Sequence, residues 1–327
     1  MSSARTAPLA DPQRKPSDPA ASLGAWVELA RPFTLLAPAL GIASAAAAAI
    51  GAVARGVVPP LGTGAVAARV VVAMLVAATL NAASNALNQV TDLDADRINK
   101  PARPVPSGRI SARAALGASL AAYAAAIAGA AWVGGACLGA VLGGAACTIA
   151  YSAPPLRFKR FGWLANATIA ASRGLLLTVA GWSSVARVGC VDPWWIGATM
   201  ALFLLGAAST KDFADIEGDR AAGCLTLPVR HGVPGTIRRI RAAFVWPFLL
   251  LPLGAVTGAL AGNPWILAVA GVGLAGLGRS IVAQLEREPL RIDSSGNHVT
   301  WRRMYLAMLA TQVAVAVAYL WPAAHGF

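Results

Sequence analysis

Long apolar runs recur along almost the whole chain and constrain its fold more than any other feature. A helix that crosses a hydrocarbon core of about 30 Å needs roughly 20 consecutive apolar residues. Runs of about this length lie at 34–54, 66–89, 113–133, 135–151, 163–184, 193–210, 240–261, 264–284 and 303–321. The chain is 57% hydrophobic and only 13% charged, which is unlike a soluble domain. The runs do not alternate polar and apolar residues, as a transmembrane β-barrel would. The sequence therefore predicts an all-α, polytopic membrane protein with nine transmembrane helices.

Basic residues are divided unevenly between the predicted loops. Most of the 27 Lys and Arg residues lie in the N-terminal tail and after the second, fourth, sixth and eighth runs. The opposite loops hold only Arg55, Arg69 and Arg187. The positive-inside rule then predicts a cytoplasmic N-terminus, with Phe327 on the far side. We attribute the net charge of +13 first to this topology and second to attraction between the basic loops and anionic lipid headgroups. We therefore expect an inner-membrane protein and no nucleic-acid partner.

The N-terminal segment differs in composition from the rest. Residues 1–22 are rich in Pro, Ala, Ser and charged side chains and lack the apolar core of a cleaved signal. We predict a disordered cytoplasmic tail there and one membrane domain at 23–327. The four cysteines stand at no metal-ligand spacing and are expected to be packing residues.

Acidic residues are concentrated in two short segments, one after the second run and one after the sixth. The first continues a helical stripe of polar residues that begins inside the apolar run: Asn81, Asn85, Asn88, Asp92 and Asp96. The second places Asp212, Asp215 and Asp219 on one helix face. Asp94 and Glu217 lie off these faces, so we expect them to be solvated or paired with arginine.

Two such clusters at helix ends would repel each other strongly at a membrane boundary, so they need cations. Oxygen ligands with no His or Cys nearby suit Mg²⁺ shared with a phosphate group. The alternative is that these residues are ordinary solvated loop charges and helix caps. The asparagines argue against it, because polar side chains inside an apolar span are costly and usually functional.

Several basic residues lie near the same membrane face. Arg173 is inside the fifth run, where an arginine is costly unless it meets an anion or the aspartates. For Arg157 and Lys159, phosphate binding and a purely topological role are equally open. The candidates for substrate contact are Arg31, Asn85, Asn88, Arg157, Lys159, Arg173 and Lys211.

Acidic clusters with Mg²⁺, surrounded by basic donors and opening into a helical bundle, indicate a site for a diphosphate with a hydrophobic tail. Loss of diphosphate from an allylic tail leaves a carbocation, from which water must be excluded. The loops at 100–111 and 223–235 are candidates for a lid.

The segments NQVTDLDADRINKPARPVPSGR, YSAPPLRFKRFG and KDFADIEGDRAAGCLTLPVRHG resemble the signature regions of the UbiA superfamily of intramembrane prenyltransferases. The first contains N-x-x-x-D-x-x-x-D and the last D-x-x-D-x-x-x-D. Gln89 stands where many members have Asp, a variant similar to the homogentisate-prenyltransferase and chlorophyll-synthase branches. The resemblance covers most of the chain from about residue 25.

The resemblance implies a nine-helix bundle around a central cavity open to lipid. Two Mg²⁺ ions would bridge the aspartates to an isoprenyl diphosphate, whose prenyl group passes to an aromatic or other lipophilic acceptor. The implied metal ligands are Asn88, Asp92, Asp96, Asp212, Asp215 and Asp219, and the five aspartates are also catalytic candidates. Arg31, Arg157 and Lys159 would contact phosphate, and Tyr151 would lie near the reacting carbon.

Other functions use the same features. A membrane terpene cyclase would ionise the same diphosphate without an acceptor. A cation-coupled transporter would bind its ion with the aspartates, but transporters usually hold such sites near the bilayer midplane. The acceptor, the prenyl length and the oligomeric state stay open.

Overall fold

The computed structural model describes residues 22–62, 64–292 and 298–321. Within these ranges the chain is helical, and its only β-pairings are isolated bridges. The prediction of a disordered tail at 1–22 falls, except for Ser22, outside the described residues, and so does the placement of Phe327.

In the described part of the chain, eight helical segments are long and apolar enough to cross a membrane, which confirms an all-α membrane protein. They are α2 (Pro32–Ala54), α3 (Val66–Thr91), α5 (Ala112–Val133), α6 (Gly135–Ser152), the run Trp163–Ser183, the run Leu227–Val256, α14 (Pro264–Arg287) and α15 (Thr300–Leu320). The run predicted at 193–210 holds α9 (Asp192–Ala207), which at 16 residues is shorter than the other eight. It is shorter than predicted because a separate helix, α10 (Ser209–Asp212), begins after Ala208.

Two of the eight segments are composite. Trp163–Ser183 contains α7 (Trp163–Ala170), a π-helical turn η2 (Ala171–Leu176) and α8 (Leu177–Ser183). Leu227–Val256 contains α12 (Leu227–Ile240), η3 (Arg241–Phe244), η4 (Trp246–Leu249) and α13 (Leu250–Val256). The remaining elements are α1 (Leu23–Ala30), α4 (Leu93–Asn99), η1 (Phe158–Arg160) and α11 (Ile216–Ala221).

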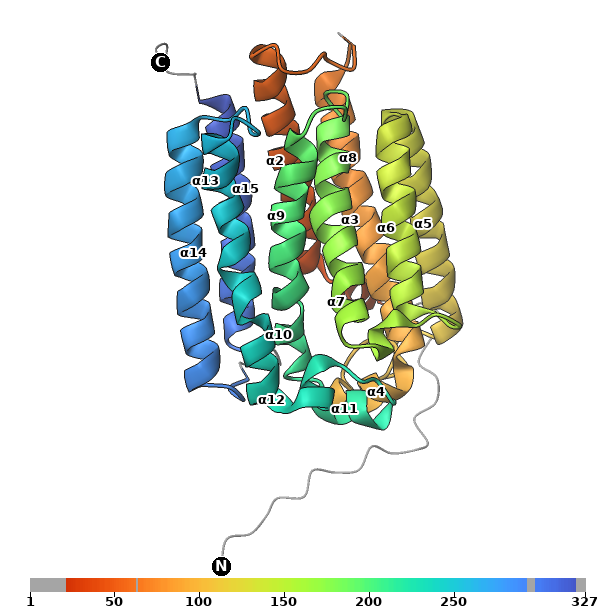
Figure 1. Ribbon diagram of the computed structural model, residues 1–327. Coiled ribbons are helices and arrows are strands. Elements are labelled where there is room, and N and C mark those ends of the chain that lie inside the picture. Colours follow the sequence, from red (N-terminus) through yellow and green to blue (C-terminus); the bar gives the residue numbers. More distant parts are fainter. Residues whose placement is uncertain (1–21, 63, 293–297, 322–327) are drawn as a thin grey trace, which may run out of the picture.

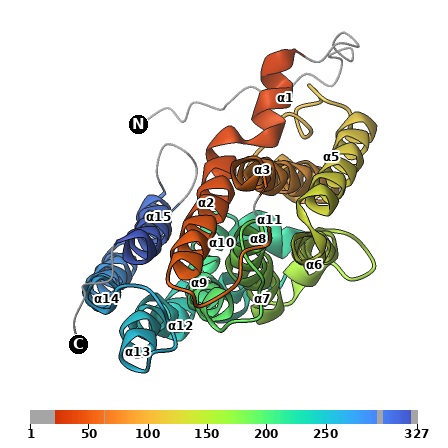
Figure 2. The ribbon, with the colours of Figure 1, turned by 90° about the horizontal axis from the view of Figure 1, so that it is seen from above.

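The long helices stand side by side, and α4, α10, α11 and α12 gather at one end of the bundle (Figure 1). We call this the motif end, because α4, α10 and α11 carry the acidic segments. Seen end-on, α14 and α15 lie at one side of the bundle and α5 and α6 at the other (Figure 2).

Small residues let the central helices approach closely, as is usual in membranes. A Cβ atom on Gly174 would lie 2.4 Å from the backbone nitrogen of Ala201 in α9. A Cβ on Gly181 would lie 2.7 Å from the carbonyl oxygen of Ile42 in α2. The Trp163–Ser183 segment is therefore held tightly between α2 and α9.

The two predicted lid loops are both packed in this structure. Residues 100–111 form turns, with Val105 and Ile110 buried against α1. Most of 223–235 is helical, because α12 begins at Leu227. The helix bends at Gly232, where φ is 67°.

Candidate functional site

A large cavity lies among the helices and reaches the motif end. It contains about 1650 Å³ of empty space, including its open mouth. Of the residues predicted to form the site, Arg157 alone does not line it. The others do: Arg31, Asn85, Asn88, Asp92, Asp96, Tyr151, Lys159, Arg173, Lys211, Asp212, Asp215 and Asp219. The two acidic segments thus face one shared space.

The first acidic segment is shaped by a break between two helices. Asp92 lies between α3 and α4, with φ −106° and ψ 15°. Its carboxylate accepts a hydrogen bond from Asn88 Nδ2 at 2.7 Å and forms an ion pair with Lys159. Asp96, on α4, is only 6% exposed and accepts two bonds from Arg103 Nη1, at 2.6 and 2.8 Å. Both carboxylates are therefore neutralised by basic side chains.

The second acidic segment occupies α10 and the start of α11. Asp215 precedes α11 and accepts bonds of 2.5 and 2.7 Å from Lys100 Nζ. Asp219 accepts a bond of 3.4 Å from the Thr226 hydroxyl. Asp212 is 7% exposed. Among the described residues, neither Asp212 nor Asp219 takes part in an ion pair.

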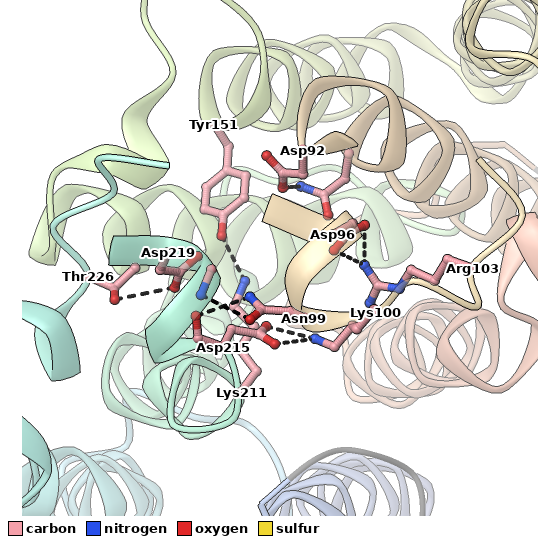
Figure 3. A network of polar contacts seen from close by, with 12 residues as sticks. Asp92, Asp96, Asn99, Lys100, Arg103, Tyr151, Lys211, Asp215, Asp219 and Thr226 are labelled. Carbon is pink, nitrogen blue, oxygen red and sulfur yellow. Dashed lines mark hydrogen bonds and ion pairs between the residues drawn. The ribbon is translucent and has the colours of Figure 1, made fainter. Parts of the chain in front are cut away.

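Asn99, the last residue of α4, joins the two segments directly. Its Nδ2 donates to the carbonyl oxygen of Asp215 at 3.1 Å, and its Oδ1 accepts from the backbone nitrogen of Gly218 at 3.0 Å. Figure 3 shows Asn99 and Lys100 reaching from α4 toward Asp215. Asn99, which follows the first motif, therefore positions the backbone of the second acidic segment.

Burial shifts the pKa values of several charged groups in the cavity. Burial, followed by the charges of neighbouring aspartates, raises the pKa of Asp212 to about 7 and that of Asp219 to about 6. Burial also lowers the pKa of Lys159 to about 8. For Arg31, burial and the neighbouring charges of Arg103 and Arg173 lower the pKa to about 10. The cavity thus holds excess charge of both signs, which a metal ion and an anion together would compensate.

The donor set of the cavity suits a hard divalent ion. The cavity offers five carboxylates and the Asn88 amide, with oxygen ligands typical of Mg²⁺. In the described part of the chain, no three His, Cys, Asp or Glu side chains converge as a metal-binding group. The carboxylates of Asp92, Asp96 and Asp215 pair with Lys and Arg instead.

Tyr151 and Lys211 form a pair at the wall of the cavity. Lys211 Nζ donates to the Tyr151 hydroxyl at 2.7 Å and lies 4.9 Å from the centre of its ring. The phenol ring and the ammonium group are thereby held facing the same space (Figure 3).

Some of the predicted polar residues have structural partners. Asn85 Nδ2 donates to the carbonyl oxygen of Ala30 and to the Thr34 hydroxyl, which fixes the backbone next to Arg31. Asn81 Nδ2 donates to the carbonyl oxygen of Thr34 in the same turn. Arg157, which does not line the cavity, lies 3.6 Å from the Asp92 carboxylate.

The structure agrees with the expectation for the acidic residues off the stripes. Asp94 is 92% exposed and pairs with Arg97, and Glu217 is exposed.

Sequence reasoning missed Asn99, Lys100, Arg103 and Thr226. Asn99 and Lys100 follow Asp96 at i+3 and i+4, so extending the helical stripe past Asp96 would have found these two. Arg103 lies in the turns after the end of α4, where helical spacing does not apply.

Comparison with known proteins decides the family. A model of the UbiA prenyltransferase family matches residues 36–301. The chain belongs to the UbiA prenyltransferase family. This membership confirms the resemblance seen in the sequence, and together with the eight apolar helical segments of the described residues it indicates an integral membrane protein.

Two kinds of curated UbiA-family relative are similar in sequence. The digeranylgeranylglyceryl phosphate synthase of Methanopyrus kandleri is 30% identical over 275 residues, covering 79% of this chain and 93% of that protein. The chloroplastic chlorophyll synthase of Avena sativa is 33% identical over 168 residues, covering 45% of this chain and 40% of that protein. The chain covers 62% of the digeranylgeranylglyceryl phosphate synthase of Methanoregula boonei.

Solved UbiA homologues share the fold. The homologue from Archaeoglobus fulgidus bound to DMAPP and Mg²⁺ has a TM-score of 0.68 and 20% identity, covering 89% of this chain and 99% of that one. A digeranylgeranylglyceryl phosphate synthase structure has a TM-score of 0.65 and 20% identity, covering 91% of this chain and 98% of that one.

Proposed function

We propose that this UbiA-family protein transfers the prenyl group of an isoprenyl diphosphate to a lipophilic, ring-containing acceptor within the membrane. The observation that carries the proposal is the shared cavity, in which both acidic segments and a ring of basic side chains surround one space. The Archaeoglobus fulgidus homologues bound to DMAPP or GPP with Mg²⁺ support the substrate class and the metal.

Two Mg²⁺ ions would be held by Asn88, Asp92, Asp96, Asp212, Asp215 and Asp219. When bound, they would supply positive charge that stabilises the departing diphosphate. The carboxylates of Asp92, Asp96 and Asp215, which pair with Lys and Arg in this structure, would then ligate the ions instead.

The basic residues released in that exchange become available for phosphate oxygens. Lys100, Arg103 and Lys159 line the cavity and pair with carboxylates in this structure. Arg31 lies in the same wall, and its positive charge is disfavoured there by burial, so an anion stabilises it. Arg157 forms an ion pair with Asp92 but does not line the cavity, and Asn85 fixes the backbone next to Arg31.

The allylic carbon lies, in this proposal, beside Tyr151, whose ring is fixed by Lys211. An electron-rich ring at that position stabilises positive charge that develops as the bond to diphosphate breaks. The hydrocarbon tail would extend toward a second, apolar cavity, which is lined mainly by Ala, Val, Leu and Ile side chains of α2, α3, α6 and the Trp163–Ser183 segment.

We further propose nine membrane crossings, with α9 as the ninth, a cytoplasmic N-terminus, and a motif end that faces the cytoplasm. The basic loops at this end support the orientation.

Product analysis by mass spectrometry tests the function. Purified protein is incubated in detergent with Mg²⁺, a panel of isoprenyl diphosphates of different length and a panel of lipophilic ring acceptors. We expect a prenylated acceptor and released diphosphate. A hydrocarbon product formed without acceptor would indicate a cyclase, and no diphosphate release with any substrate would contradict both readings.

A further inference from the structure

Three exposed arginines lie where α12, η3 and α14 meet, outside the large cavity. Arg238 is in the last turn of α12, Arg241 begins η3, and Arg279 lies on α14. The backbones of η3 and α14 are in close contact, since a Cβ atom on Gly278 would clash with the carbonyl oxygen of Phe244. Two distant parts of the chain therefore bring their arginines to one surface.

The positive charge of this surface has no described counter-charge. Among the described residues, none of the three arginines takes part in a hydrogen bond or an ion pair. The chain contains no Asp or Glu from Arg220 to Leu285. The next carboxylate on α14, that of Glu286, lies seven residues beyond Arg279, about 10 Å along the helix. A surface of this kind attracts an anion.

The outer face of α14 leads from Arg279 into the membrane-crossing part of the helix. Trp265, Val269 and Val272 are each more than 60% exposed, and Gly276 is exposed as well. With Arg279 they follow one another at i, i+4, i+7, i+11 and i+14, so they form one stripe along the helix. A Cβ on Gly276 would meet no atom within 4 Å, so the stripe is open there. We call these five residues the α14 stripe.

The α14 stripe faces away from the rest of the bundle. Seen end-on, α14 lies at one side of the bundle (Figure 2), and its opposite face packs on η3 and α13 through Gly278 and Gly271. The apolar part of the α14 stripe is therefore in contact with lipid acyl chains in a membrane.

Arg279 lies near the boundary between hydrocarbon and headgroups. It is eight residues before the end of α14 at Arg287, about 12 Å along the helix. A long arginine side chain at such a position extends toward the membrane surface and places its guanidinium among the headgroups. Trp246, five residues after Arg241, is 67% exposed, which is typical of tryptophan at a membrane interface. The basic surface is thus at the level of lipid phosphates.

We propose that Arg238, Arg241 and Arg279 bind the phosphate of an anionic phospholipid whose acyl chain lies along the α14 stripe. Guanidinium groups suit phosphate oxygens because they donate two parallel hydrogen bonds. Arg239, next to Arg238, is exposed too and donates to the carbonyl oxygen of Gly235 at 2.9 Å, so it adds positive charge from a fixed position. None of these arginines lines the large cavity, so this lipid site is separate from the proposed site of prenyl transfer.

A soluble phosphate compound is the competing ligand for the same charges. It would use the arginines but not the α14 stripe, which runs away from the motif end. The continuous path from Arg279 to the exposed Val272 and Val269 favours a ligand with both a phosphate and a long apolar chain.

Lipid binding to the full chain tests the assignment. The purified, delipidated protein in a neutral detergent is titrated with dioleoyl phosphatidylglycerol or with dioleoyl phosphatidylcholine, and bound lipid is measured by native mass spectrometry. We expect phosphatidylglycerol to bind at least about tenfold more tightly, because each basic side chain near an anionic lipid contributes about fivefold in affinity. The preference should weaken at high salt. Glycerol 3-phosphate should not compete at the same concentration, because it lacks the acyl chain.

Variants assign the preference to this surface. Arg241→Gln and Arg279→Gln should each weaken binding of phosphatidylglycerol about fivefold, and the double variant should bind both lipids equally. Arg113→Gln is the matched control, because Arg113 is an exposed arginine in the first turn of α5, at the other side of the bundle. It should keep the wild-type preference. The affinity for geranyl diphosphate should be unchanged in all four proteins, which also shows that they are folded.

Three results would overturn the proposal. The first is equal binding of the two lipids by the wild-type protein. The second is a preference for phosphatidylglycerol that the double variant retains, or that Arg113→Gln loses to the same extent. The third is competition by glycerol 3-phosphate at equal concentration, which would assign the arginines to a soluble phosphate compound.

Discussion

Asn99 and Gly218 form the direct link between the two acidic segments of this UbiA-family chain. Asn99 Oδ1 accepts a hydrogen bond of 3.0 Å from Gly218, and a Cβ atom on Gly218 would lie 2.3 Å from Asn99 Nδ2. The fit leaves no space for a side chain at position 218. The relative position of the two carboxylate sets therefore depends on this contact.

Gly218→Ala should displace Asn99 and separate the two acidic segments. We expect a loss of activity of about tenfold or more, because misplacing catalytic groups by about 1 Å is sufficient for such a loss. Turnover and the melting temperature of the purified variant are measured together. Gly117→Ala on α5 is the matched control, since a Cβ there meets no atom within 4 Å. Equal activity of the two variants would contradict the role of the Asn99 contact.

Lys100→Met removes the partner of Asp215 inside the cavity. We expect a strong fall in the affinity for isoprenyl diphosphate, because a positive charge near the phosphate is lost and Asp215 is left unpaired. Arg97→Met, in the adjoining helix α4, is the control: Arg97 is exposed and pairs with exposed Asp94, a type of contact that contributes about 0–1 kcal/mol. Similar affinities in both variants would argue against a direct role for Lys100.

Mg²⁺ binding should depend on pH through Asp212 and Asp219. Their pKa values of about 7 and about 6 lie above the ordinary 3.8, so the metal-free site favours the protonated forms. The metal-free protein accordingly loses stability as the pH rises through these values. Mg²⁺ competes with the same protons, so its affinity should rise between about pH 5.5 and about pH 7.5. Thermal shift measured against Mg²⁺ concentration at several pH values tests this, and a constant affinity would contradict it.

Asp192 provides a stability prediction away from the site. It is 3% exposed and accepts hydrogen bonds from the Tyr319 hydroxyl at 2.5 Å and from the backbone nitrogen of Ala261 at 2.9 Å. Asp192→Ala leaves both donors buried and unpaired, which costs about 1–3 kcal/mol each. We expect a lower melting temperature in detergent with unchanged substrate affinity. Asp94→Ala is the exposed control, and equal melting temperatures would refute the prediction.

Helical spacing predicted that the aspartates of each segment share a face, and all five line one cavity. The helices are not continuous as expected, because α3 and α4 are broken at Asp92 and α10 and α11 are separated by residues 213–215. Asp92, Asp96 and Asp212 follow apolar runs that end on the same membrane side, so a shared site follows from length and topology alone. The family membership was likewise predictable from the two motifs.

Other features depend on tertiary packing that the local sequence does not encode. Arg157 has a positive φ of 42° and lies 3.6 Å from the Asp92 carboxylate, a contact that the sequence did not predict. Lys100 and Arg103 pair with Asp215 and Asp96 from the segment that follows α4, and Val105 and Ile110 of this segment pack against α1. The split between α9 and α10 shortens a run that is continuous in hydropathy.

Mg²⁺-dependent binding of an isoprenyl diphosphate tests the central claim most directly, since the claim requires both acidic sets to hold one ligand. Titrations with geranyl diphosphate are compared, with and without EDTA, for the wild-type protein, Asp92→Ala and Asp215→Ala. We predict tight binding only for the wild type with Mg²⁺, and loss of it when either carboxylate is removed from a protein that remains folded. Wild-type affinity in either variant, or in excess EDTA, would contradict a jointly held diphosphate.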